Sequence, residues 1–164
     1  MSSRRRRTGP ALALARLTHV QWFAVNLYEA VVRIPERLAD EHDRTDRPRG
    51  RGPLRRGSPA RYHVPAIPLV LGSAVAAVAT GPRSTGARRA TVTAAGSSLA
   101  ATVLTGYLVR TVNLRLLDDG GPITPDERDR LLARWDAVNG VRLVLLAVAT
   151  AGFEYAARSG PETR

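Results

Sequence analysis

The stretch ATVTAAGSSLAATVLTGYLV, residues 90–109, runs for twenty residues without a charged side chain. A helix of this length can cross the ~30 Å hydrocarbon core of a bilayer, because each residue adds ~1.5 Å. Three further stretches, residues 14–32, 64–81 and 138–157, are of similar length and nearly as apolar. These stretches predict an all-α integral membrane protein, a four-helix bundle that crosses the cell membrane four times.

Charge divides the chain in the same way. The 164 residues include 25 basic and 14 acidic side chains, and the formal net charge is +11. Inside the four apolar stretches, the charged residues are Arg16, Glu29, Arg142 and Glu154. The remaining charges fall in connectors and tails, so the composition is that of membrane spans joined by Arg-rich segments.

The segments outside the spans are expected to be mostly disordered. We predict a membrane domain over residues 11–157, a basic tail at 1–10 and a second tail at 158–164. Residues 36–59 are rich in Arg, Asp, Gly and Pro, and a segment so poor in apolar side chains is expected to form a disordered linker.

Several partners and classes of site are disfavoured by composition. The chain contains no cysteine, which argues against a disulfide scaffold and a Cys-ligated metal site, and three scattered histidines predict no metal site. The Arg-rich stretch 44–61 has no aromatic residue for base stacking, so the lipid bilayer is the expected partner and nucleic acid is not. The distribution of Arg leaves the orientation of the termini open, and the oligomeric state is open too.

Local signals predict how the helices begin, end and pack. The third span should continue as helix to Leu117, and Thr124 reads as the N-cap of the last helix, with Glu127 three residues on. The second and third spans carry small residues at four-residue spacing, such as Gly72 with Ala76, which predicts close helix packing.

The first span carries a polar stripe. Its residues are spaced by 3, 4, 3 and 4 positions, which places them on one helix face, and they are His19, Trp22, Asn26, Glu29 and Arg33. Ionisable groups are costly against lipid, so this face should point into the bundle. A simpler interpretation is also open. In it, Glu29 and Arg33 form an ion pair at the helix end, and His19 and Asn26 form hydrogen bonds with neighbouring helices.

The fourth span has a matching pattern in Trp135, Asn139 and Arg142, at positions i, i+4 and i+7. An indole, an amide and a fixed cation on one face suit a planar aromatic or anionic ligand. Alternatively, Arg142 reaches the membrane surface with its long side chain. His63, beside Tyr62 at the start of the second span, is interpreted as an ordinary residue of the membrane–water interface.

Three segments resemble a known family. They are NLYEAVVRIP at 26–35, VNLRL at 112–116 and RWDAVNGVR at 134–142, and the spacing W-x-x-x-N-x-x-R in the last is the most specific. Together they are similar to the anthrone oxygenase-like family of small membrane proteins, much of which is classed as domain of unknown function 1772. The long Arg-rich linker departs from the family pattern, which leaves its role open.

The resemblance implies a four-helix membrane bundle and, for members with an assigned role, oxidation of anthrones to anthraquinones by dioxygen without a cofactor. Four residues match recurrent positions of the family by type: Asn113, Trp135, Asn139 and Arg142. The expected small-molecule partner is therefore a hydrophobic aromatic compound.

This activity can be assigned to residues as a hypothesis. The rings of Trp22 and Trp135 would bind the substrate, and His19 or Glu29 would act as the base that removes a proton. Arg142 and Asn139 would donate hydrogen bonds to the enolate oxygen that forms. The amides of Asn26 and Asn113 would position the substrate or these side chains. The alternative is a non-catalytic membrane protein, a binding or transport element or a partner subunit, whose polar stripe only holds the helices together.

Overall fold

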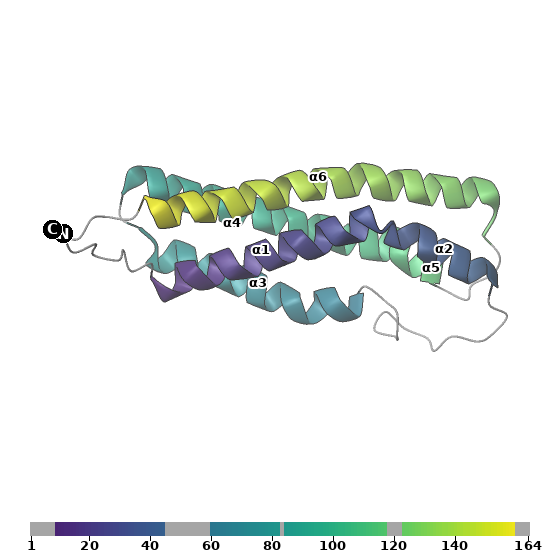
Figure 1. The fold of residues 1–164 in the computed structure, drawn as a ribbon, viewed down its shortest axis with the longest axis horizontal. Coiled ribbons are helices and arrows are strands. Elements are labelled where there is room, and N and C mark those ends of the chain that lie inside the picture. Colours follow the sequence, from purple (N-terminus) through teal and green to yellow (C-terminus); the bar gives the residue numbers. More distant parts are fainter. Residues whose placement is uncertain (1–8, 45–59, 83, 118–122, 160–164) are drawn as a thin grey trace.

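The computed structural model describes residues 9–44, 60–82, 84–117 and 123–159, and within these ranges all regular secondary structure is helical (Figure 1). Four helices are long: α1 (Pro10–Val31), α3 (Ala60–Thr80), α4 (Thr85–Leu108) and α6 (Pro125–Arg158). Three segments are short: α2 (Ile34–Arg44), the π-helix η1 (Val109–Asn113) and α5 (Leu114–Leu117). Most of both predicted tails and linker residues 45–59 lie outside the described residues.

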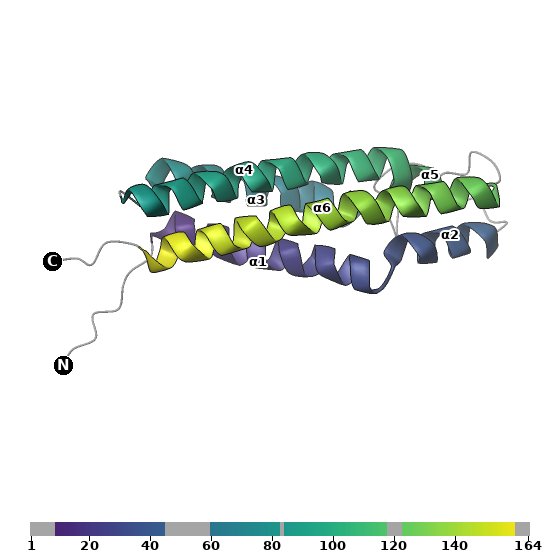
Figure 2. The same cartoon turned by 90° about the horizontal axis from the view of Figure 1, so that it is seen from above.

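The four long helices run along a common axis, each antiparallel to the helices it contacts (Figures 1 and 2). Helix α1 packs against α3 and α6, and α4 packs against the same two helices. The start of α1 and the end of α6 lie at one end of the molecule. The contacts therefore bring together side chains from the first and the last helix of the chain.

Three of the helical segments are long and apolar enough to cross a membrane: His63–Thr80, Thr85–Leu116 and Pro125–Arg158. They contain the third and fourth spans predicted from sequence, and all of the second except residue 81. Helix α1, with 22 residues, is long enough but is not among them. Its polar stripe lowers its mean hydropathy, so the predicted span at 14–32 is less apolar than the three helical segments above.

Helix α2 corrects the prediction of disorder for residues 36–44. Its buried Leu38 lies in an apolar cluster with Trp135 of α6, and Asp40 forms an ion pair with Arg128. The prediction of disorder from composition was wrong here, because neighbouring helices supply the apolar surface that this segment lacks.

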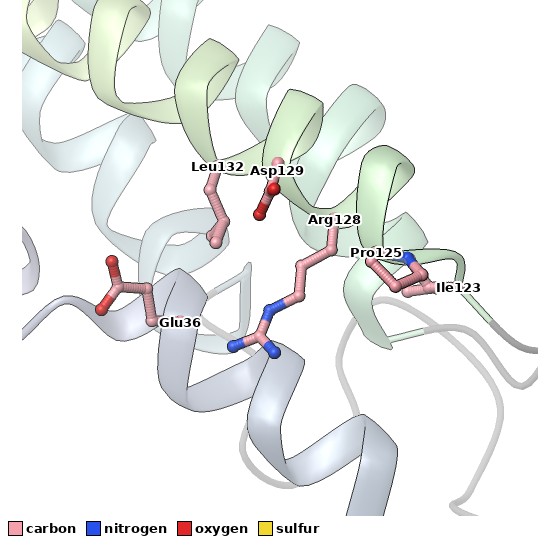
Figure 3. Close-up of a pocket in the computed structure, with 6 residues that line it drawn as sticks. All are labelled: Glu36, Ile123, Pro125, Arg128, Asp129 and Leu132. Carbon is pink, nitrogen blue, oxygen red and sulfur yellow. The ribbon is translucent and has the colours of Figure 1, made fainter.

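The contact of α2 with α6 leaves a hollow of about 270 Å³ at this end of the molecule. Figure 3 shows Arg128 extending from α6 toward α2, with Glu36 of α2 nearby. The lining is mixed and comprises Glu36, Ile123, Pro125, Arg128, Asp129 and Leu132. Charged side chains thus gather where α2 meets the first turns of α6.

The predicted helix ends are confirmed in two places. Helix continues through α4, η1 and α5 to Leu117, although the π-helical turn was not predicted. The hydroxyl oxygen of Thr124 accepts a hydrogen bond from the backbone N–H of Glu127 at 3.2 Å, as expected for an N-cap.

The closest helix packing does not use the predicted glycine. A Cβ placed on Gly72 would meet nothing within 4 Å, whereas one on Gly152 of α6 would lie 2.9 Å from the carbonyl oxygen of Ala90 and 2.9 Å from the Cβ of Ala94. The tight approach is therefore between α4 and α6.

Candidate functional site

Arg142 lies at the centre of a buried polar network. Its side chain is 3% exposed, and its guanidinium donates to Oδ1 of Asn139 at 2.6 and 3.0 Å. It also lies 3.4 Å from the hydroxyl of Thr105 on α4 and 3.3 Å from Oε2 of Glu29 on α1. The reading in which Arg142 reaches for the membrane surface is wrong, because its polar atoms bind partners inside the protein.

Glu29 joins three helices. One carboxylate oxygen pairs with Arg142 of α6, and the other accepts a hydrogen bond from Nε2 of His63 on α3 at 3.0 Å. The side chain of His63 is 2% exposed and that of Glu29 is 13% exposed. A carboxylate, an imidazole and a guanidinium therefore meet in surroundings that are otherwise mainly apolar, where electrostatic interactions are strong.

The predicted ion pair between Glu29 and Arg33 does not form. The backbone turns after α1, where Arg33 has a positive φ of 53°. Arg33 instead pairs with Glu36 in the first turn of α2, and its side chain is 66% exposed. The end of the helix separates Arg33 from the stripe and leaves Glu29 to the interior.

His19 occupies a separate buried position. Its Nδ1 donates to the carbonyl of Ala15 at 2.7 Å, since a carbonyl can only accept, and its Nε2 then accepts from the hydroxyl of Ser98 at 2.8 Å. Its ring packs against Phe153, with 4.6 Å between centroids. Ten residues, or about 15 Å of helix, separate His19 from Glu29, so the two predicted bases do not share one site.

Trp22 and Asn26 lie between these two positions on α1. The rings of Trp22 and His63 form a T-shaped pair, with 5.0 Å between centroids. The amide nitrogen of Asn26 donates to the carbonyl of Trp22 at 2.6 Å. Within the described part of the chain, Oδ1 of the fully buried Asn26 has no hydrogen-bond partner.

Trp135 and Asn113 lie outside the network. Trp135 is buried in the apolar cluster that includes Leu38, whereas Trp22 belongs to a different cluster with Leu146. The two indoles therefore do not form the single slot that we predicted from the sequence. Asn113 is 8% exposed in η1, and its Oδ1 lacks a hydrogen-bond partner among the described residues.

The sequence interpretation missed three residues of these networks: His63, Ser98 and Thr105. Ser98 and Thr105 had a detectable signal, because they stand seven residues apart and, with Thr91, follow one face of α4. The sequence around His63 carries no comparable pattern. Among the described residues, no group of three or more His, Cys, Asp or Glu side chains could hold a metal ion.

Comparison with family models identifies the family of this chain. The family model described as anthrone oxygenase matches residues 58–152, more than half of the chain. The matched region includes α3, α4 and most of α6, with His63, Asn113, Asn139 and Arg142, while Glu29 precedes it. Neither the curated proteins nor the solved structures gave a match. The chain belongs to the anthrone oxygenase family.

Proposed function

We propose that this protein is a four-helix bundle of the cell membrane that oxidises an anthrone, a planar phenolic ketone, to the anthraquinone with dioxygen and without a cofactor. The family match supports the reaction class, and three apolar helices support the location. The observation that carries the proposal is the 3.3 Å contact between the Glu29 carboxylate and the buried Arg142 guanidinium. This contact holds a candidate base beside a fixed cation.

Helix α1 serves as the fourth span in this proposal. Its outward side chains Leu17 and Val31 are 70% and 72% exposed, a pattern suited to lipid contact. Its charged side chains face other helices, since Arg16 pairs with Glu154 at 2.7 Å and Glu29 pairs with Arg142. Pairing of this kind lowers the cost of charge inside a membrane.

The reaction is balanced without any metal or flavin. A base removes a proton from the methylene carbon of the anthrone, and the negative charge spreads to the ketone oxygen as an enolate. The carbon then gives electrons to dioxygen and forms a C–O bond, and the peroxide takes up a proton. Removal of the second methylene proton with loss of water leaves the new carbonyl, so anthrone and O₂ give anthraquinone and H₂O.

In this scheme, Glu29 is the base and His63 exchanges its proton. Arg142 stabilises the enolate oxygen, and Asn139 holds the guanidinium in position through two hydrogen bonds. Trp22 contacts the aromatic substrate. The Oδ1 atoms of Asn26 and Asn113 have no hydrogen-bond partner among the described residues, and we assign them as acceptors for a substrate hydroxyl or a water molecule. His19 remains the alternative base.

The test uses the full chain in lipid nanodiscs with anthrone under air, following oxygen uptake and anthraquinone absorbance. We expect Glu29→Gln to lower the rate by about 100-fold or more, the usual range for a lost general base, and Glu36→Gln to leave it unchanged. Loss of activity in His19→Ala with full activity in Glu29→Gln would assign the base to His19. Wild-type protein no faster than empty nanodiscs would overturn the proposal.

A non-catalytic role is the second candidate, and the interhelical hydrogen bonds favour it. The hydroxyls of Thr18 and Ser73 lie 2.9 Å apart, and His19 bonds Ser98 across helices. If the polar groups only join helices, Asn139→Ala should lower the melting temperature equally with and without anthraquinone, and wild-type protein should show no oxidation.

A further inference from the structure

A groove lies between α1 and α3, which run side by side (Figure 1). Its volume of about 320 Å³ falls within the range of small-molecule sites. The floor is formed by Trp22 and Val70, which are 1% and 3% exposed and belong to one apolar cluster. Leu69, which is 54% exposed, stands at the rim. The groove thus joins the outer surface of the helices to their core.

The mouth of the groove is polar. Exposed Arg61, in the first turn of α3, lines it together with Pro65. Pro65 has no N–H, so it cannot donate the helical hydrogen bond to the carbonyl of Arg61. A cation and a carbonyl without its usual helical donor therefore stand at the same end, and this pair suits a phenol hydroxyl, which both accepts and donates.

Trp22 connects the groove to the buried network. Its side chain lines the groove and also forms a T-shaped pair with the ring of His63, which bonds Glu29. Trp22 thus contacts both the groove and the His63 ring. The groove opens to the outer surface beside the exposed side chain of Leu69.

We propose that this groove is the docking site through which a planar hydroxylated aromatic compound enters from the bilayer, with its rings on Trp22 and its hydroxyl at Arg61. The inference rests on the proposed function for the identity of the ligand. The partner is a flat, sparingly soluble phenol, because the groove offers an indole, mostly apolar walls and a cation at Arg61, while Thr18 and Gln21 of α1 complete its lining. Such a compound partitions into lipid and reaches the groove laterally.

Binding can be measured without turnover. The chain has two tryptophans, so in a Trp135→Phe background the fluorescence reports Trp22 alone. The probe is 1-hydroxyanthraquinone, with unsubstituted anthraquinone for comparison, added to the full chain in nanodiscs. We expect saturable quenching that Ala66→Phe, which fills the groove, weakens by about tenfold or more, while Val75→Phe on the outer face of α3 has no effect.

A second variant keeps the test decisive if Ala66→Phe fails to fold. Arg61 is exposed, and Arg61→Gln should remove the preference for the hydroxylated probe over the parent quinone. Quenching that is absent, or that is equal in all variants, would overturn the inference. Quenching by brominated acyl chains that the probe does not relieve would also overturn it, because lipid would then hold the groove. Binding without oxidation would instead refute the proposed reaction and leave the docking site standing.

Discussion

The carboxylate of Glu29 lies 3.3 Å from the guanidinium of Arg142, although 113 residues separate the two in the chain. Neither charge could be left unpaired in this interior without a large desolvation cost. The pair links the first helix to the last, and His63 and Asn139 complete its hydrogen bonding. Stability and proposed chemistry therefore depend on the same atoms.

The first prediction concerns this pair. Glu29→Gln should lower the free energy of unfolding by about 3 kcal/mol, because it leaves Arg142 buried without a counter-charge. The double variant Glu29→Gln with Arg142→Met should recover most of that loss, since no unpaired charge remains. Unfolding in one detergent, arranged as a double-mutant cycle, measures the coupling. Additive effects of the two substitutions would contradict the pairing.

Arg142→Lys tests geometry at constant charge. A lysine keeps the cation but lacks the planar guanidinium that donates twice to Asn139 and reaches Glu29. We expect the rate of anthrone oxidation to fall by about tenfold or more while helicity is retained. Arg134→Lys, an exposed position on the same helix, is the control. Equal rates in both variants would exclude a positioned guanidinium.

Ser98→Ala removes the donor to Nε2 of His19. The buried nitrogen then lacks a partner, and we expect a loss of about 1–3 kcal/mol in unfolding free energy. Ser97→Ala, on the less buried neighbouring position, should change stability by less than about 0.5 kcal/mol. Nitrogen NMR of labelled histidine gives an independent check, because the contacts require the Nδ1–H tautomer. An Nε2–H tautomer would contradict the bond to the carbonyl of Ala15, because an unprotonated Nδ1 cannot donate to it.

Gly152→Ala should loosen the contact between α4 and α6. The added Cβ would stand 2.9 Å from a backbone oxygen and from the Cβ of Ala94, so the helices must move apart, at a cost of about 1–3 kcal/mol. Gly140→Ala on the same helix meets nothing within 4 Å and should stabilise α6 by up to about 1 kcal/mol through helix propensity. Thermal unfolding of the two variants should thus shift in opposite directions, and shifts of the same sign would refute the close approach.

The sequence predicted the helical class well because long apolar stretches indicate it, and it predicted the burial of most of the stripe because the spacing of those residues indicates one helix face. His19, Trp22 and Asn26 share one face at 3.6 residues per turn, and all three are buried. Asn139 and Arg142 were found in the same way. Periodicity identifies a face and not its partner, so it could not show that Glu29 pairs with Arg142 and His63 instead of Arg33.

Two further features could not be predicted in full. Pro35 indicates that the first helix ends ahead of it, but it does not indicate the form of the turn. The turn at Arg33 has a positive φ, which a non-glycine residue adopts only where its surroundings require it. Helix α2 is ordered by contacts with distant residues such as Trp135, and a window of 36–44 contains none of them. Both features arise from tertiary structure, which local composition does not encode.

The π-helical turn at Val109–Asn113 acts as a single inserted residue that resets the phase of the helix. Up to residue 112, the buried positions of α4 and η1 alternate in steps of four and three, and the next step of three would bring position 115 to the core. The wider turn lengthens that step, so Leu116 is buried while Arg115 turns aside to bind Glu127 at 2.7 Å. A plain α-helical turn through the same residues would instead bring Arg115 to the core face, toward the hydrophobic cluster around Trp135, whereas deleting Thr111 would remove the extra residue and keep Leu116 buried.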